Sequence, residues 1–198
     1  MKFLAFTDIH ENREALAKLA KRAASSDVDF SICAGDFSTF GKGLQVVLKR
    51  FEEIKKPLYI IPGNHEEHLD LVQLFEKYSF CTLLHEKDLI VGEYVLLGYG
   101  GGGFSQHDPH FRKIARNWYG THKGKKIILV THGPPHHTKL DDLDGRHVGN
   151  IDYRKFIERI NPTIAISGHL HETVGLIDTI GKTKLINPGW DGMVIELS

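Results

Sequence analysis

A stretch near the amino terminus decides the fold; it reads FLAFTDIH over residues 3–10. Its four apolar residues, Phe3 to Phe6, are typical of a short buried strand, and the polar residues Asp8 and His10 follow at once. Residues 11–24 then place alanines and leucines at helical spacing. The segment therefore predicts a strand, a polar strand end and a helix, which is the first unit of an α/β fold.

The same alternation continues to about residue 80. Strands are expected over 28–34 and 58–61, and helices over 44–54 and around 69–75. The pattern then changes, because three short apolar runs surround a turn at Gly92 and Glu93. These runs predict antiparallel strands over 81–84, 89–91 and 94–97.

The second half of the chain predicts a similar mixture of elements. A helix capped by Asp108 is expected to reach Tyr119, and a second helix to cover 151–160. Between them lie a buried strand over 127–130 and a long loop over 131–150, of a length that is usually functional or mobile. The remaining strands are expected over 163–167, 173–177, 183–186 and 193–197. With no repeat or linker, residues 1–198 predict one α/β domain with two mixed sheets flanked by helices.

Side chains of the kind that bind metals follow five of the expected strands. They are Asp8 and His10, Asp36, Asn64 with His65, His132, and His169 with His171. Carboxyl ends of strands in an open α/β sheet form binding crevices, so these groups are expected to converge. Residues two apart on extended chain point the same way, which suits Asp8 with His10 and His169 with His171 to chelation.

Each of these residues taken alone has a simpler interpretation. A single Asp or His at a strand end is more often a cap or a hydrogen-bonded turn residue. Glycine, however, stands next to Asp36, Asn64, His132 and His169, where it permits tight turns and close approach of the backbone. The joint pattern favours one shared site.

Five ordered blocks carry a resemblance to a known family. They are Asp8-Ile9-His10, Gly35-Asp36, Gly63-Asn64-His65-Glu66, Thr131-His132-Gly133 and Gly168-His169-Leu170-His171. The sequence resembles the calcineurin-like metallophosphoesterases, in particular small prokaryotic members. The resemblance implies a four-layer αββα sandwich, the metallo-dependent phosphatase fold, in which helices enclose two mixed sheets.

The resemblance also implies a two-metal site with Asp36 as the bridge. One metal would be held by Asp8, His10, Asp36 and His171, and the other by Asp36, Asn64, His132 and His169. Imidazole with carboxylate and amide oxygen suits Mn, Fe, Zn, Co or Ni, of which we favour Mn, whereas Mg and Ca prefer oxygen alone. Two dications against two carboxylates leave a charge of about +2, which attracts a phosphate and holds a hydroxide at neutral pH.

The hypothesis that follows is a phosphoesterase acting on a small phosphorylated substrate, with phosphodiesters ahead of phosphomonoesters. A hydroxide bridging the metals would attack phosphorus in line, and His65 would protonate the leaving oxygen as general acid. The alternative for His65 is a histidine at a helix start that hydrogen-bonds a neighbour.

Weaker signals lie outside the five blocks. His136, His137, Lys139 and Arg146 in the long loop are candidate substrate contacts, or serve loop structure alone. Residues 98–103 satisfy a glycine pattern for dinucleotide binding, but Lys123 stands where an acidic ribose ligand is expected. The sequence Asn187-Pro188-Gly189 predicts a turn near the site.

Composition excludes several classes of protein. Lys and Arg (25) balance Asp and Glu (25), so no net charge recruits nucleic acid or a membrane surface. Two cysteines without a Cys-x-x-Cys pair fit neither a disulfide scaffold nor a structural zinc site, and Cys33 is expected to be buried. No apolar run has the length of a signal peptide or membrane span, so we expect a cytoplasmic protein.

Two other functions remain open, as does the oligomeric state. A nuclease of the same family is disfavoured by the neutral charge, although residues 107–126 carry six basic side chains, more typical of solvated surface than of a phosphate-guiding rim. A silent protein-binding scaffold would require decay of the site, yet all seven expected ligands and His65 are present.

Overall fold

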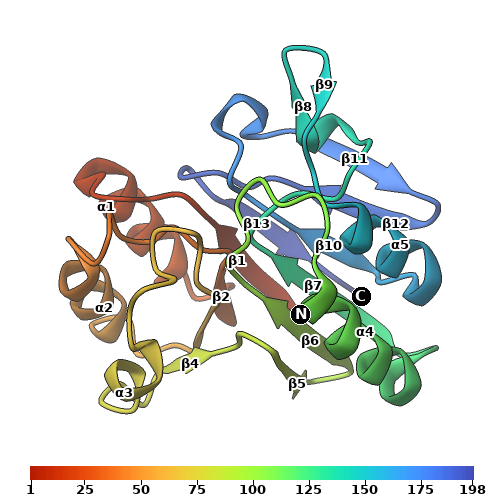
Figure 1. Ribbon diagram of the computed structural model, residues 1–198. Helices are drawn as coiled ribbons and strands as arrows, with labels where there is room; N and C mark the ends of the chain where they lie inside the picture. The colour runs from red at the N-terminus through yellow and green to blue at the C-terminus, as the bar shows by residue number, and fades with distance from the viewer.

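Two mixed β-sheets pack face to face and carry helices on their outer sides in the computed structural model, which describes residues 1–198 (Figure 1). Helices α1 (Arg13–Ala23) and α2 (Leu44–Glu52) cover the outer face of one sheet. Helices α4 (Pro109–His122) and α5 (Ile151–Ile160) cover the other. The four-layer fold implied by the sequence is confirmed. None of the helices has the length and apolar character needed to cross a lipid bilayer.

The first sheet has the strand order β13-β1-β2-β3-β4. Its strands are β1 (Lys2–Phe6), β2 (Phe30–Cys33), β3 (Leu58–Ile60), β4 (Cys81–Leu83) and β13 (Met193–Glu196). Only β13 runs antiparallel to its neighbour. The expectation that the segment starting at Cys81 is antiparallel was wrong, because the short helix α3 (Leu71–Phe75) returns the chain and lets β4 pair parallel with β3.

The second sheet has the strand order β11-β12-β10-β7-β6-β5. Its strands are β5 (Lys87–Val91), β6 (Tyr94–Tyr99), β7 (Lys126–Thr131), β10 (Ile164–Ile166), β11 (Ile177–Ile180) and β12 (Thr183–Ile186). The predicted antiparallel pairing of β5 with β6 around Gly92 is confirmed. A strand over 173–177 was wrong: the chain forms the 3-10 helix η2 (His171–Thr173), where the buried Thr173 hydroxyl donates to the Leu170 carbonyl at 3.0 Å.

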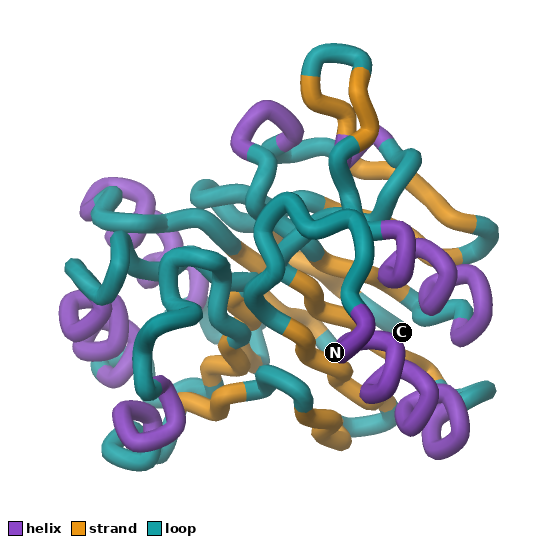
Figure 2. Tube along the Cα trace, viewed as in Figure 1, coloured by secondary structure: helices purple, strands orange, loops and turns teal.

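The start of α4 follows the predicted capping chemistry. Asp108 Oδ1 accepts the backbone N–H groups of His110 and Phe111, with Pro109 in the first turn of α4. Asn150 caps α5 in the same way. The long loop between β7 and α5 contains a 3-10 helix, η1 (Lys139–Asp141), and a small hairpin of β8 (Asp142–Leu143) and β9 (Arg146–His147), which projects from the body (Figure 2).

Alternation along β1 explains why the sheets stack. Phe3 and Ala5 point into the core between the sheets, whereas Leu4 and Phe6 point toward α1 and α2. The facing strands of the second sheet contribute their own inward side chains, among them Leu96, Ile128 and Ile164, all fully or nearly fully buried. Burial of this apolar surface stabilises the pairing of the two sheets.

Removal of one inward side chain is expected to weaken this pairing. Ile128 is 0% exposed, so Ile128→Ala leaves a cavity and should lower the free energy of unfolding by about 2–5 kcal/mol. Ile90 on β5 is 70% exposed, and Ile90→Ala should change it by less than about 0.5 kcal/mol. Urea unfolding followed by circular dichroism measures both; equal losses would contradict this packing.

Candidate metal centre

The five polar strand ends meet at one edge of the molecule, although they belong to two sheets. Asp8, Asp36 and Asn64 follow the parallel strands β1, β2 and β3 of the first sheet. His132 and His169 follow the parallel strands β7 and β10 of the second. Because the sheets are stacked, ligand-type groups from both face one cleft.

Possible ligand atoms cluster in three overlapping groups, within which they all lie within 4.8 Å of one another. The groups are Asp8, His10 and His171; His10, Asp36 and His65; and Asp36, His132 and His169. Asn64 joins through its Oδ1, which is 3.0 Å from His132 Nε2. All seven side chains expected from the sequence thus come together, with His65 among them.

Asp36 is the centre of the cluster. Its Oδ2 lies 3.5 Å from His132 Nε2 and 4.0 Å from His10 Nε2, so one carboxylate oxygen faces nitrogens of both outer groups. Its Oδ1 accepts the backbone N–H of His65 at 3.0 Å, which fixes the plane of the carboxylate. This position suits a ligand shared between two cations.

The backbone at the site is unusual. Asp8, His10, Asp36 and His169 all have left-handed φ angles, between 48° and 69°. Non-glycine residues rarely adopt this conformation, and it persists where the surrounding structure imposes it. Four such residues within one group of seven indicate a geometry maintained for function.

Two glycines permit the close packing of this backbone. A side chain at position 63 would collide with the Asp36 carboxylate, and one at position 168 would collide with Asp8. The absence of a side chain at Gly63 and Gly168 therefore leaves room for the carboxylates of Asp36 and Asp8.

Glu66 is a buried residue for which the sequence alone indicated no role. One of its carboxylate oxygens accepts the backbone N–H groups of Asp36 at 3.0 Å and Gly63 at 2.9 Å. The other accepts from the backbone N–H and the hydroxyl of Ser38. Burial raises the pKa of Glu66, and these donated hydrogen bonds oppose that rise. Glu66 thereby connects the turn after β2 to the turn after β3.

Charge at the cluster is balanced between Asp36 and His132. Burial alone would raise the pKa of Asp36. The hydrogen bond and the charge of His132 act against burial, and the pKa of Asp36 is lowered to about 2. Burial alone would lower the pKa of His132, but Asp36 raises it to about 9. His132 Nδ1 donates to the Ala34 carbonyl at 2.9 Å, which directs Nε2 toward Asp36 and Asn64.

Buried side-chain atoms that lack a hydrogen-bond partner indicate whether cations fit this site. Asp8 Oδ1 and His169 Nε2 are buried and have no hydrogen-bond partner. Nε2 of His10 and Nε2 of His171 face each other at 3.4 Å. Burial, helped by His132, lowers the pKa of His169 to about 4, which keeps its imidazole in the neutral form that binds metals. These oxygen and nitrogen atoms have lone pairs that no hydrogen-bond donor satisfies, and they lie close together. Such a set of atoms fits divalent transition metals.

His65 lies beside these groups. Its Nε2 is 3.9 Å from Asp36 Oδ2, and its Nδ1 is buried without a partner. The ring stacks on Phe40 with centroids 4.3 Å apart and planes 25° apart. The imidazole is therefore held at the cleft by packing rather than by a hydrogen bond to a neighbour.

The cleft has a volume of about 530 Å³ and a mixed lining. Besides His10, Asp36, Asn64, His65, His169 and His171, it is lined by Thr39, Phe104, Leu143, Leu170 and Glu172. His136, His137, Lys139 and Arg146 are not among the lining residues; from their loop only Leu143 is. His136 and His137 instead lie against His147, with centroids 5.8 and 4.4 Å apart. Their role as substrate contacts stays a prediction.

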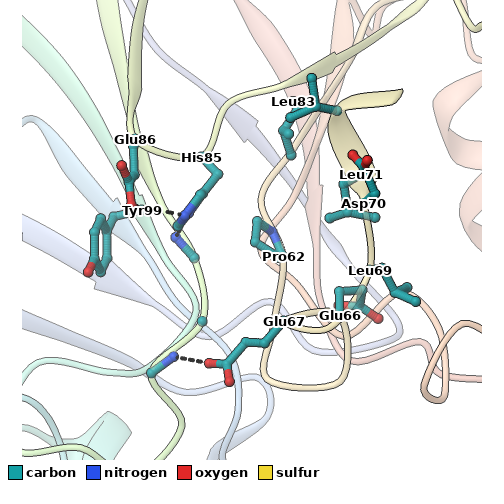
Figure 3. Close-up of a pocket in the computed structure, with 14 residues that line it drawn as sticks. Pro62, Glu66, Glu67, Leu69, Asp70, Leu71, Leu83, His85, Glu86 and Tyr99 are labelled. Carbon is teal, nitrogen blue, oxygen red and sulfur yellow. Dashed lines mark hydrogen bonds and ion pairs between the residues drawn. The ribbon is translucent and has the colours of Figure 1, made fainter. Parts of the chain in front are cut away.

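Two further segments buttress the site. The turn at Asn187-Pro188-Gly189 lies next to it as expected, because the Gly189 carbonyl accepts the N–H of Thr7 and Asn187 Nδ2 donates to the Leu170 carbonyl. The glycine loop after β6 packs on the turn after β3: Gly101 N donates to the Pro62 carbonyl and Gly102 N to Glu67 Oε1. Glu67, Pro62 and Tyr99 border a separate cavity of about 340 Å³ at this junction (Figure 3).

Comparisons with known proteins agree with this fold. A family model described as calcineurin-like phosphoesterase matches residues 1–173. The chain belongs to the calcineurin-like phosphoesterase family.

Individual relatives extend the comparison. The chain is 30% identical to an uncharacterized protein of Methanocaldococcus jannaschii, over 95% of this chain and 88% of that one. It is 24% identical to a probable glycerophosphodiester phosphodiesterase of Arcobacter nitrofigilis, over 72% of this chain and 56% of that one. Among solved structures, a Thermus thermophilus protein, TT1561, superposes with a TM-score of 0.74 at 17% identity, over 96% of this chain and 90% of that one, and has the same fold.

Metal loading is expected to release protons. Because Asp36 raises the pKa of His132 to about 9, this imidazole is protonated near neutral pH and must lose its proton to become a ligand. The apparent affinity for Mn²⁺ should therefore rise, by up to about tenfold per pH unit, from about pH 6.5 to 8.5. Titration calorimetry in buffers of different ionisation enthalpy measures the protons released. An affinity independent of pH would contradict this assignment.

Glu66→Gln is expected to loosen the turns that carry Asp36 and Asn64. An amide group cannot accept from all the donors that the carboxylate serves, so the free energy of unfolding should fall by about 1.5–3 kcal/mol. Mn²⁺ affinity should fall about 10- to 100-fold. Glu76→Gln, at an exposed position of the same loop and helix region, is the control. Thermal unfolding and metal titration of both variants test this, and unchanged metal affinity in Glu66→Gln would refute it.

Proposed function

We propose that this chain is a phosphoesterase that uses two divalent metal ions, with Mn favoured, to hydrolyse a small phosphodiester. The observation that carries the proposal is the convergence of seven ligand-type side chains and His65 on one cleft. Buried ligand atoms without partners, Asp8 Oδ1 and His169 Nε2, support metal binding at this place.

The ligands divide into two sets that share Asp36. Asp8, His10, Asp36 and His171 would hold one cation, and Asp36, Asn64, His132 and His169 the other. When bound, the two cations supply the Lewis acidity that activates water as nucleophile and offset the charge of the phosphate. The left-handed backbone, Glu66 and the glycines hold these ligands in place before substrate arrives.

His65 is proposed as the general acid. Its ring lines the cleft beside Asp36, and no hydrogen bond to another side chain occupies it. Phe40 packs against its face and restricts its orientation. From this place the imidazolium can donate a proton to the oxygen of the departing alcohol, which avoids release of an alkoxide.

The charge of the cleft supports diesters over monoesters. No Lys or Arg lines it, and Glu172 adds a carboxylate to its border. A diester carries one negative charge at neutral pH and a monoester up to two. A cleft without a Lys or Arg side chain therefore suits the less charged substrate. The Arcobacter nitrofigilis relative is named as a probable glycerophosphodiester phosphodiesterase.

Hydrolysis by wild type and two variants tests the proposal. Mn²⁺-loaded wild type should hydrolyse alkyl diesters faster than the matching monoesters. His65→Ala should keep its metal and lose about 10²- to 10⁴-fold in kcat, because an alkoxide leaving group needs the proton. Asp36→Asn should lose metal and rate together.

The readouts are metal content by atomic spectroscopy and phosphate release. His68→Ala, an exposed histidine three residues further along, is the control and should match wild type. Absence of hydrolysis with every divalent ion, together with a stable protein partner, would replace the proposal with the scaffold hypothesis.

A further inference from the structure

Two large exposed apolar side chains lie at the cleft or next to it: Phe104 is one of the lining residues, and Phe40 follows the lining residue Thr39. Phe40 is 65% exposed and Phe104 is 58% exposed. Each ring contacts a histidine of the site: Phe40 stacks on His65, and Phe104 meets His169 edge-to-face with centroids 4.4 Å apart. Isolated exposed phenylalanines are common, but two that contact histidines of one cleft need an explanation.

The backbone presents Phe40 to solvent at a conformational cost. Its φ is 50°, which is unfavourable for a bulky side chain. Thr39 and Lys42 exchange backbone hydrogen bonds of 3.1 and 3.0 Å around it, and the turn is completed by glycine at position 41. Strain of this kind, combined with an exposed aromatic ring, points to a role outside folding.

The loop that precedes Phe104 is also held by hydrogen bonds. Phe104 follows the glycine loop that Pro62 and Glu67 anchor (Figure 3), and Gly103 lies against Asn64 and His169. The anchored loop thus carries the ring to the lining of the cleft, beside His169.

The remaining lining offers few contacts for the organic part of a substrate. It provides Thr39, Leu143, Leu170 and the carboxylate of Glu172, and no cationic side chain. The exposed rings of Phe104, in the lining, and of Phe40, against His65, therefore provide the aromatic surfaces on which the groups esterified to the phosphate can pack. Aromatic faces favour planar groups, which stack on them with little loss of conformational freedom.

We infer that Phe40 and Phe104 form an aromatic clamp for a phosphodiester whose alcohol groups are planar, as in nucleosides or aryl alcohols. Phe40, beside the proton donor His65, contacts the departing alcohol, and Phe104, beside His169, contacts the alcohol that stays on phosphorus. The inference rests on the proposed function and adds the substrate class to it.

Three esters with the same p-nitrophenolate leaving group separate the two rings. In methyl p-nitrophenyl phosphate only the leaving group is planar, whereas in phenyl p-nitrophenyl phosphate and thymidine 5′-(p-nitrophenyl phosphate) the retained group is planar too. Phe104→Ala should raise KM about tenfold for the second and third esters and leave the methyl ester unchanged. Phe40→Ala should raise KM for all three.

The leaving group also isolates stacking from proton donation. The p-nitrophenolate ion departs without protonation, so a change in KM reports packing on Phe40 rather than altered support of His65. Ile90→Ala, an exposed apolar residue on β5, is the matched control. Metal content of every variant should equal that of wild type. A larger gain with thymidine than with phenyl would assign nucleosides as the substrate group, and the reverse would assign aryl groups.

Binding without turnover distinguishes failure of the clamp from failure of the proposed function. If wild type hydrolyses none of the esters, the proposed function fails, and the affinities of Mn²⁺-loaded protein for phenylphosphonate and methylphosphonate still test the clamp by calorimetry. The clamp predicts about tenfold tighter binding of the phenyl compound, lost in Phe104→Ala. Equal affinities, or equal effects of Phe104→Ala on methyl and aryl esters, would overturn it.

Discussion

The buried carboxylate of Asp36 is the constraint on which the rest of the site depends. It must face nitrogens from both sheets. Three features hold it there: the left-handed φ at Asp36, the absence of a side chain at Gly63, and the backbone hydrogen bonds that Glu66 accepts. Such a carboxylate is costly to bury unless charge or cations compensate it. His132 supplies that charge here, which is why the pKa values of the two groups diverge so widely.

Much of the fold and the cluster could be predicted because both depend on local sequence. Apolar runs ending in Asp, Asn or His mark strand ends, and adjacent glycines mark close approach. The direction of β4 and the turn after His171 could not be predicted, since a helix of only five residues and a single Thr173 hydroxyl decide them. Periodicity carries no record of such tertiary contacts.

The clamp and Glu66 show where sequence stops being informative about function. Glu66 stands inside one of the five sequence blocks, yet its partners, backbone N–H groups and the Ser38 hydroxyl, lie up to 30 residues away. Phe40 and Phe104 look like ordinary core residues until their exposure is known. Conversely, the polar loop residues His136 and His137 look suited to phosphate, but they pack on His147 away from the cleft lining. The chemical type of a side chain suggests a role, but its position in the fold determines whether it can perform that role.

Division of the ligands between two stacked sheets has a consequence for motion. A cation bound by the proposed ligands would be held by both sheets, so the two layers could not slide or separate without releasing it. Amide hydrogens deep in β1 and β7 would then exchange with solvent at rates governed by metal occupancy, although neither strand touches the ion along most of its length. Cellular supply of the metal would in this way set the rigidity of the whole molecule.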